Sequence, residues 1–128
     1  MEALEIRRRL AAGSPEAYEP DVATALNNLA ILHSDTQRLA EAESEYVEAL
    51  EIRRRLAAGS PEAYEPYVAR TLYNLAMFFK TSGRDEEALA SAREALETYG
   101  RCAERNPKQF GDDLKDARAL VEQLEENA

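Results

Sequence analysis

The sequence of 128 residues has few of the side chains that build catalytic and metal sites. It contains one cysteine, one histidine and no tryptophan. A single cysteine excludes an internal disulfide framework. One histidine and one cysteine also leave little from which to form a zinc-type ligand cluster or a nucleophile–base pair. The chain has no Gly-rich phosphate loop, no Gly-x-Ser-x-Gly motif and no zinc-ligand spacing. We therefore predict a protein that is not an enzyme and that uses no cofactor or metal.

Positive charge is scarce as well. Lys and Arg number 16 against 25 Asp and Glu, which gives a formal net charge of −9. This balance argues against nucleic-acid binding, which leaves a basic footprint. No apolar run is long enough to span a membrane, and the first residues lack the basic and apolar regions of a signal peptide. We expect a single domain in the cytoplasm, with no nucleic-acid or membrane partner.

What the sequence does contain is an internal repeat. The residues from Glu2 to Pro20 recur without change from Glu48 to Pro66, 46 positions later. The same spacing relates Tyr18 and Tyr64 to Phe110, so the period extends through the chain at about 2.8 copies. A fixed period of this size with helical composition predicts a solenoid.

Each period is expected to hold two helices. The first is predicted over residues 20–34, where apolar side chains recur at helical spacing and Pro20 fits the first turn. The second is predicted over residues 38–58, ended by Gly59 as a C-cap and followed by a loop that reaches Pro66. The later helices are predicted at 66–82, 85–105 and 112–126. These limits divide the domain into a partial repeat (1–19), two repeats (20–65 and 66–111) and a C-terminal capping helix (112–128).

These helix pairs resemble tetratricopeptide repeats. Copy one carries Leu26-Asn27-Asn28-Leu29-Ala30 on the first helix, and copy two carries Leu72-Tyr73-Asn74-Leu75-Ala76. On the second helices, Tyr46 precedes Ala49-Leu50, and Ala95-Leu96 follows in copy two. The strings are most similar to the long repeats of kinesin light chain-type and bacterial arrays. The resemblance implies an all-α fold, a right-handed superhelix of antiparallel helix pairs, whose first helices line a concave protein-binding groove.

This sequence departs from the family pattern in two respects. Its period of 46 residues exceeds the usual 34. We assign the additional residues to a longer second helix and to the loop that ends at Pro66. Gln37 also stands where copy two keeps an inter-helix glycine, Gly83.

The resemblance places the candidate binding residues on the first helices. An Asn side chain both donates and accepts hydrogen bonds, so Asn28 and Asn74 are predicted to hold an extended peptide backbone. The other interpretation is that they tie down a neighbouring helix or loop. Apolar and basic side chains beside them suit a peptide with apolar and acidic character. The predicted groove comprises Asn27, Asn28, Ile31, Arg70, Tyr73, Asn74, Met77 and Lys80.

We expect a non-enzymatic module that binds a peptide or partner segment. The alternative is self-assembly, because Met1 falls within a second helix and the incomplete terminal repeats of two copies could stack end to end. Arg118 and Glu122 make the last helix polar, as a capping helix requires, and oppose this stacking. Weak homo-oligomerisation is therefore kept as the alternative prediction.

Three further features have structural interpretations. His33 occupies the position of Phe79 in copy two, so we expect a polar-tipped core residue. Cys102 falls at an apolar position and is expected in the core, with redox sensing as the alternative. The triplet 53–55 is expected on a solvated face, with Arg55 paired to Glu51, because three consecutive helical residues cannot form one flat patch.

Overall fold

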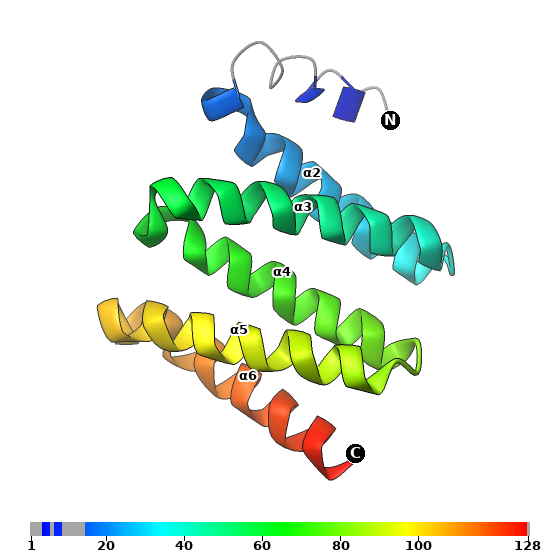
Figure 1. The fold of residues 1–128 in the computed structure, drawn as a ribbon, viewed down its shortest axis with the longest axis vertical. Coiled ribbons are helices and arrows are strands. Elements are labelled where there is room, and N and C mark those ends of the chain that lie inside the picture. Colours follow the sequence, from blue (N-terminus) through cyan, green and yellow to red (C-terminus); the bar gives the residue numbers. More distant parts are fainter. Residues whose placement is uncertain (1–3, 6, 9–14, 128) are drawn as a thin grey trace. The chain divides into compact units, whose positions relative to one another are not determined.

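The described part of the chain is helical throughout. The computed structural model describes all residues except 1–3, 6, 9–14 and 128. The partial repeat expected at residues 1–19 therefore lies largely outside the described residues. The long helices are α2 (Pro15–Asp35), α3 (Leu39–Gly59), α4 (Pro61–Thr81), α5 (Asp85–Arg105) and α6 (Pro107–Glu126), and the described residues include no strand (Figure 1). The predicted all-α helical-repeat fold is confirmed. None of the described helices is long and apolar enough to cross a membrane.

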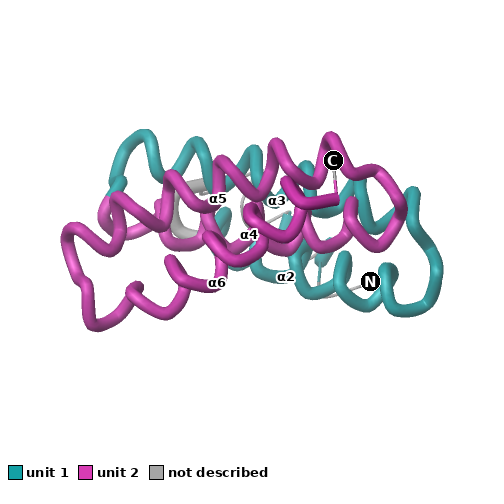
Figure 2. Tube along the Cα trace, turned by 90° about the horizontal axis from the view of Figure 1, so that it is seen from below, with its two compact units in different colours: residues 1–61 teal, residues 62–128 magenta. Residues whose placement is uncertain are grey.

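The chain divides into two compact units, residues 1–61 and 62–128 (Figure 2). In unit 1, α2 packs against α3 over a core of buried apolar side chains. Its members are Leu4, Val22, Ala23, Leu26, Ala49 and Ile52. In unit 2, α5 runs back along α4, and α6 packs against α5 (Figure 1). Ala69, Tyr99 and Ala117 form the buried centre of a cluster in this unit, one from each of its helices. Alanine at these contacts lets the helices approach closely.

Helix length accounts for the 46-residue period. Helices α2, α3, α4 and α5 each contain 21 residues. A three-residue turn follows α2 and α4, and one residue, Ser60 or Asn106, follows α3 and α5. At 1.5 Å per residue each helix is about 31 Å long. Compared with the family's usual repeat, the additional residues therefore lengthen both helices of the pair.

The predicted starts of the first helices were wrong. They were placed at Pro20, Pro66 and Asp112, but the helices begin at Pro15, Pro61 and Pro107. The predicted loop before Pro66 forms the first turns of α4. A proline fits the first helical turn because the N–H it lacks would have no acceptor there. Pro20 and Pro66 instead lie inside their helices, where each removes one backbone hydrogen bond.

The predicted C-cap at Gly59 was also wrong. Gly59 is the last residue of α3, and Ser60 is the cap, with φ −147° and ψ 77°. Asn106 has nearly the same backbone angles, φ −147° and ψ 82°. These links need no left-handed residue, so the glycine is not required for the connection.

The inter-helix turns do contain left-handed residues. Gln37 has φ 65° and Gly83 has φ 77°. In both turns the following N–H bonds back to the helix, from Arg38 to His33 O (2.7 Å) and from Arg84 to Phe79 O (2.8 Å). Together with the bonds from Gln37 and Gly83 to the helix carbonyls, this is the Schellman arrangement. Glycine is favoured at this position because it lacks a Cβ atom.

We expect Gln37→Gly to stabilise the protein by about 0.5–1 kcal/mol. Relief of left-handed strain exceeds the entropy that glycine adds to the unfolded chain. Urea denaturation measures the change. Gly83→Ala is the matched control and should destabilise by about 1 kcal/mol through backbone strain alone, since a Cβ there would meet no atom within 4 Å. A loss of stability in Gln37→Gly would contradict the strain assignment.

Candidate functional site

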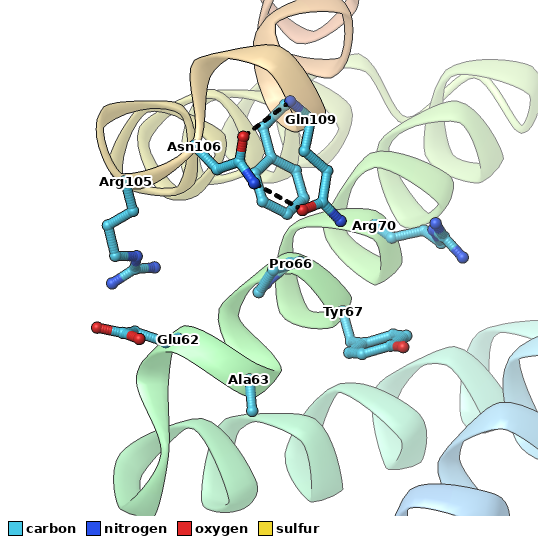
Figure 3. A pocket seen from close by; sticks show the side chains of 9 residues that line it. Glu62, Ala63, Pro66, Tyr67, Arg70, Arg105, Asn106 and Gln109 are labelled. Carbon is cyan, nitrogen blue, oxygen red and sulfur yellow. Dashed lines mark hydrogen bonds between the residues drawn. The ribbon is translucent and has the colours of Figure 1, made fainter.

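Unit 2 contains a cavity of about 410 Å³ between the first half of α4 and the junction of α5 with α6. Figure 3 shows Tyr67 and Arg70 at one end of the site and Glu62 and Arg105 at the other. Its wall combines aromatic, amide and charged side chains. The lining residues are Glu62, Ala63, Pro66, Tyr67, Arg70, Arg105, Asn106, Gln109 and Phe110.

The α5–α6 junction forms a fixed wall. Asn106 caps α6, because its Oδ1 accepts from the Gln109 backbone N–H at 3.2 Å. Its Nδ2 donates to Gln109 Oε1 at 3.1 Å, so the two side chains hold each other (Figure 3). Phe110 packs against the core cluster of unit 2. This wall is therefore tied to the core on one side and exposed to the cavity on the other.

Glu65 neutralises the arginine of this wall. Its carboxylate accepts from Arg105 Nη2 at 2.6 Å and from Arg101 Nε at 3.1 Å. Burial alone would raise the pKa of the Glu65 carboxyl, but the hydrogen bonds from Arg105 and Arg101 outweigh it and hold that pKa below its usual value. In unit 1 the equivalent Glu19 pairs with Arg55. Glu65 thus binds two arginines where its counterpart binds one.

We expect Glu65→Gln to lower the unfolding free energy at pH 7 by about 1 kcal/mol. A carboxyl with a lowered pKa stabilises the fold fully above the pKa of the unfolded chain, near 4.3 for Glu. This contribution is lost as the pH falls through the lower pKa of the folded state. Wild type and variant should therefore converge in acid, as measured by urea denaturation across pH. Glu19→Gln, with its single arginine partner, should have the smaller effect at pH 7.

Arg70 lies beside an aromatic side chain at the cavity. Its guanidinium carbon lies 6.0 Å from the centre of the Tyr67 ring. Burial, followed by the nearby Asp113, raises the pKa of Tyr99 to about 12, against the smaller opposing effect of Arg70. Tyr99 is therefore neutral at pH 7. Among the residues that the structure describes, Arg70 makes no ion pair with a carboxylate.

The structure places the predicted groove residues at different depths. In unit 1, Asn28 and Ile31 are exposed on α2, whereas Asn27 is buried. In unit 2, Arg70 and Met77 are exposed on α4. The predicted set is thus divided between the units, and of its members Arg70 alone lines the cavity.

The remaining predicted residues of α4 already make contacts within the chain. Tyr73 packs against the core cluster, and burial, then Asp116, raises the pKa of its hydroxyl. Asn74 is half-buried and already interacts within the chain. Lys80 Nζ donates to Gln123 Oε1 of α6 at 3.0 Å.

Sequence reasoning missed most of the cavity, including Pro66, Tyr67 and Phe110. Pro66 and Tyr67 were assigned to the first turn of the helix predicted at 66–82, and Phe110 to the region before the helix predicted at 112–126. One signal was available in the sequence: the identical runs end at Pro20 and Pro66, and the next residue is Asp21 in one copy and Tyr67 in the other.

The interpretations of the isolated polar residues were partly right. His33 is buried, with Nδ1 2.7 Å from Glu45 Oε1, and Cys102 is buried, so both predicted core positions are confirmed. Burial raises the pKa of the Cys102 thiol. The solvated face expected for the arginine triplet was wrong for Arg53, which is buried and donates to Thr24. The expected partner of Arg55 was wrong too, because the guanidinium reaches α2 and not Glu51 on its own helix.

Comparison with known proteins identifies the family. The sequence pattern of the tetratricopeptide repeat matches residues 21–101, a span that runs from the first half of α2 into α5. A search of functionally characterised proteins gives no match. Repeats of this type generally mediate protein–protein interaction and are typically non-enzymatic. The matched span covers more than half of the chain, and the chain therefore belongs to the tetratricopeptide repeat family.

Proposed function

We propose that this chain is a non-enzymatic module that binds a segment of a partner protein along α4, with the cavity of unit 2 as the anchor point. One observation carries the proposal. Tyr67, Arg70, Asn74 and Met77 follow at three- and four-residue spacing and so share one face of α4. Tyr67 is 43% exposed and Met77 is 38% exposed, which is unusual for large apolar side chains in a row. The cavity lies at the N-terminal end of this row.

The chemistry of the row suggests the chemistry of the partner. Exposed tyrosine, methionine and arginine are side chains that often carry binding energy at interfaces. Tyr67 and Met77 would cover an apolar side chain, and Arg70 would meet an acidic one. Asn74, on the same face of α4, would contact the backbone of the segment. A partner segment with both apolar and acidic residues fits this surface best.

The test is a selection for binding peptides. The chain is immobilised and offered a phage-displayed library of random peptides, and enriched peptides are synthesised and titrated by fluorescence polarisation. We expect Tyr67→Ala or Met77→Ala to raise the Kd at least about tenfold, which corresponds to about 1.4 kcal/mol. Leu39→Ala removes a similarly exposed apolar side chain from unit 1 and should leave the Kd unchanged.

Two results would contradict the proposal. The first is a library from which no peptide is enriched. The second is binding that survives both α4 substitutions. Light scattering in the same buffers tests the alternative function, because a molar mass that rises with protein concentration would favour self-assembly.

A further inference from the structure

The first helices of the repeat differ in which face they bury. The 46-residue period makes Leu32 of α2, Phe78 of α4 and Leu124 of α6 equivalent. Leu124 is 2% exposed and Phe78 is 5% exposed, but Leu32 is 56% exposed. About one and two turns earlier the equivalent side chains are buried on α4 and α6 and half-buried on α2. These side chains are Leu29, Leu75 and Val121, and Ala25, Thr71 and Ala117. We call Ala25, Leu29 and Leu32 the open face of α2.

In unit 2 the second helix α5 covers the equivalent face of α6. Ala117 of α6 lies in one core cluster with Tyr99 of α5. Arg93 Nη2 of α5 lies 2.9 Å from Glu125 Oε2, next to Leu124 in the last turn of α6. The first half of α5 therefore reaches the end of α6 (Figure 1). The buried side chains in that half are small, namely Ala88, Ser91 and Ala92. An antiparallel helix with small side chains is thus what fits this face.

The open face of α2 is apolar, unlike the other uncovered helix face of the described residues. On α6, the exposed Arg118 and Glu122 stand where copy one has the buried Leu26 and Ala30. That face of α6 is therefore polar where no described helix covers it. On α2 a leucine is exposed instead. Exposed apolar side chains in one place, with a polar border, mark an interaction site.

The border of the open face is acidic. Asp21, Asn28 and Asp35 recur every seven residues, so they lie along one side of it, and all three are exposed. Helix α2 contains no Lys or Arg, and Asp35 lies at its C-terminal end, where the helix dipole adds negative potential. Arg38, in the turn that follows, is already paired with Glu41 at 2.9 Å. A covering helix with Lys or Arg at its edge therefore fits α2.

We propose that the open face of α2 binds a basic amphipathic helix of a partner protein, which lies antiparallel to α2 as α5 lies against α6. The face belongs to unit 1 and shares no residue with the row on α4 or with the cavity, so this is a second binding surface. A second copy of this chain fits less well. Its own open face has the same acidic border, and each copy carries a net charge of −9.

Two displayed libraries of helical peptides test the proposal. Both hold alanine-rich peptides of the length of α5 with one randomised apolar face. The positions that border this face are Lys and Arg in the basic library and Glu in the acidic library. The chain is immobilised and offered each library, and enriched peptides are synthesised and titrated by fluorescence polarisation. We expect enrichment from the basic library only.

Substitutions locate the bound helix. Leu32→Ala should raise the Kd of an enriched basic peptide at least about tenfold, and Asp35→Asn should raise it about threefold. Val47→Ala is the matched control, because it truncates an apolar side chain of α3 that is 39% exposed, and it should leave the Kd unchanged. Tyr67→Ala, which alters the row on α4, should also leave it unchanged. Circular dichroism verifies that each variant folds.

The failures of this inference are distinct from those of the proposed function. If the basic library gives no binder, or if its binders tolerate Leu32→Ala, the open face does not bind a basic helix, and the binding of a segment along α4 is unaffected. Weaker binding by Tyr67→Ala would place the peptide on α4 and overturn the inference. Equal enrichment from the acidic library would overturn the charge assignment. A molar mass that rises with concentration in wild type but not in Leu32→Ala would show that a second copy covers the face.

Discussion

Leu26→Ala should lower the free energy of unfolding by about 3–5 kcal/mol. Leu26 has no exposed surface and lies in the core cluster of unit 1, between α2 and α3. Truncation removes its apolar contacts with this cluster and leaves a cavity that 21-residue helices on either side cannot readily close. A loss of this size is a large part of the stability of a small domain.

Leu32→Ala is the matched control for Leu26→Ala, because it makes the same chemical change on the same helix. Leu32 is 56% exposed, so the expected change is within about 0.5 kcal/mol. Urea denaturation followed by far-ultraviolet circular dichroism measures both variants. Repeat proteins can unfold in more than one step, so midpoint and slope are compared together. Similar losses in the two variants would contradict the burial of Leu26.

The second helices could be predicted from sequence almost to the residue. The prediction for α3 was one residue early at each end, and α5 was placed at Asp85–Arg105, as observed. Their starts follow three-residue turns that contain a left-handed residue, and their ends precede a proline. The starts of the first helices were harder to predict from the sequence. Two prolines lie five positions apart there, and either could begin a helix. Choosing between them requires the packing of the additional turn, which periodicity does not encode.

The site shows the same limit. Arg70 and Met77, which were selected by repeat register, are exposed on α4. Register identifies equivalent positions but not their depth, and Asn27, the equivalent of Tyr73, is buried. The wall made by Asn106 and Gln109 could not be inferred either, because it depends on a one-residue link where the sequence suggested a loop. The cavity therefore depends on where the helices begin and end, and no sequence motif marks it.

His33→Phe should lower the free energy of unfolding by about 1–3 kcal/mol, although phenylalanine is the residue at this position in copy two. His33 is 4% exposed and pairs with Glu45, whose side chain is 15% exposed. The substitution removes the imidazole, and Glu45 is left as a largely buried carboxylate without that hydrogen bond. In unit 2 the equivalent positions hold Phe79 and the small residue Ser91, and both are buried.

Restoring that pairing should recover most of the stability. Adding Glu45→Ser to His33→Phe removes the buried charge and leaves room for the ring. In unit 2 the guanidinium carbon of Arg84 lies 4.6 Å from the centre of the Phe79 ring, and Arg38 is the equivalent arginine next to His33. A double-mutant cycle by urea denaturation should give a favourable coupling of about 1 kcal/mol or more between the two substitutions. Purely additive losses would mean that His33 and Glu45 contribute independently, and that the polar pair does not act as a substitute for the aromatic one.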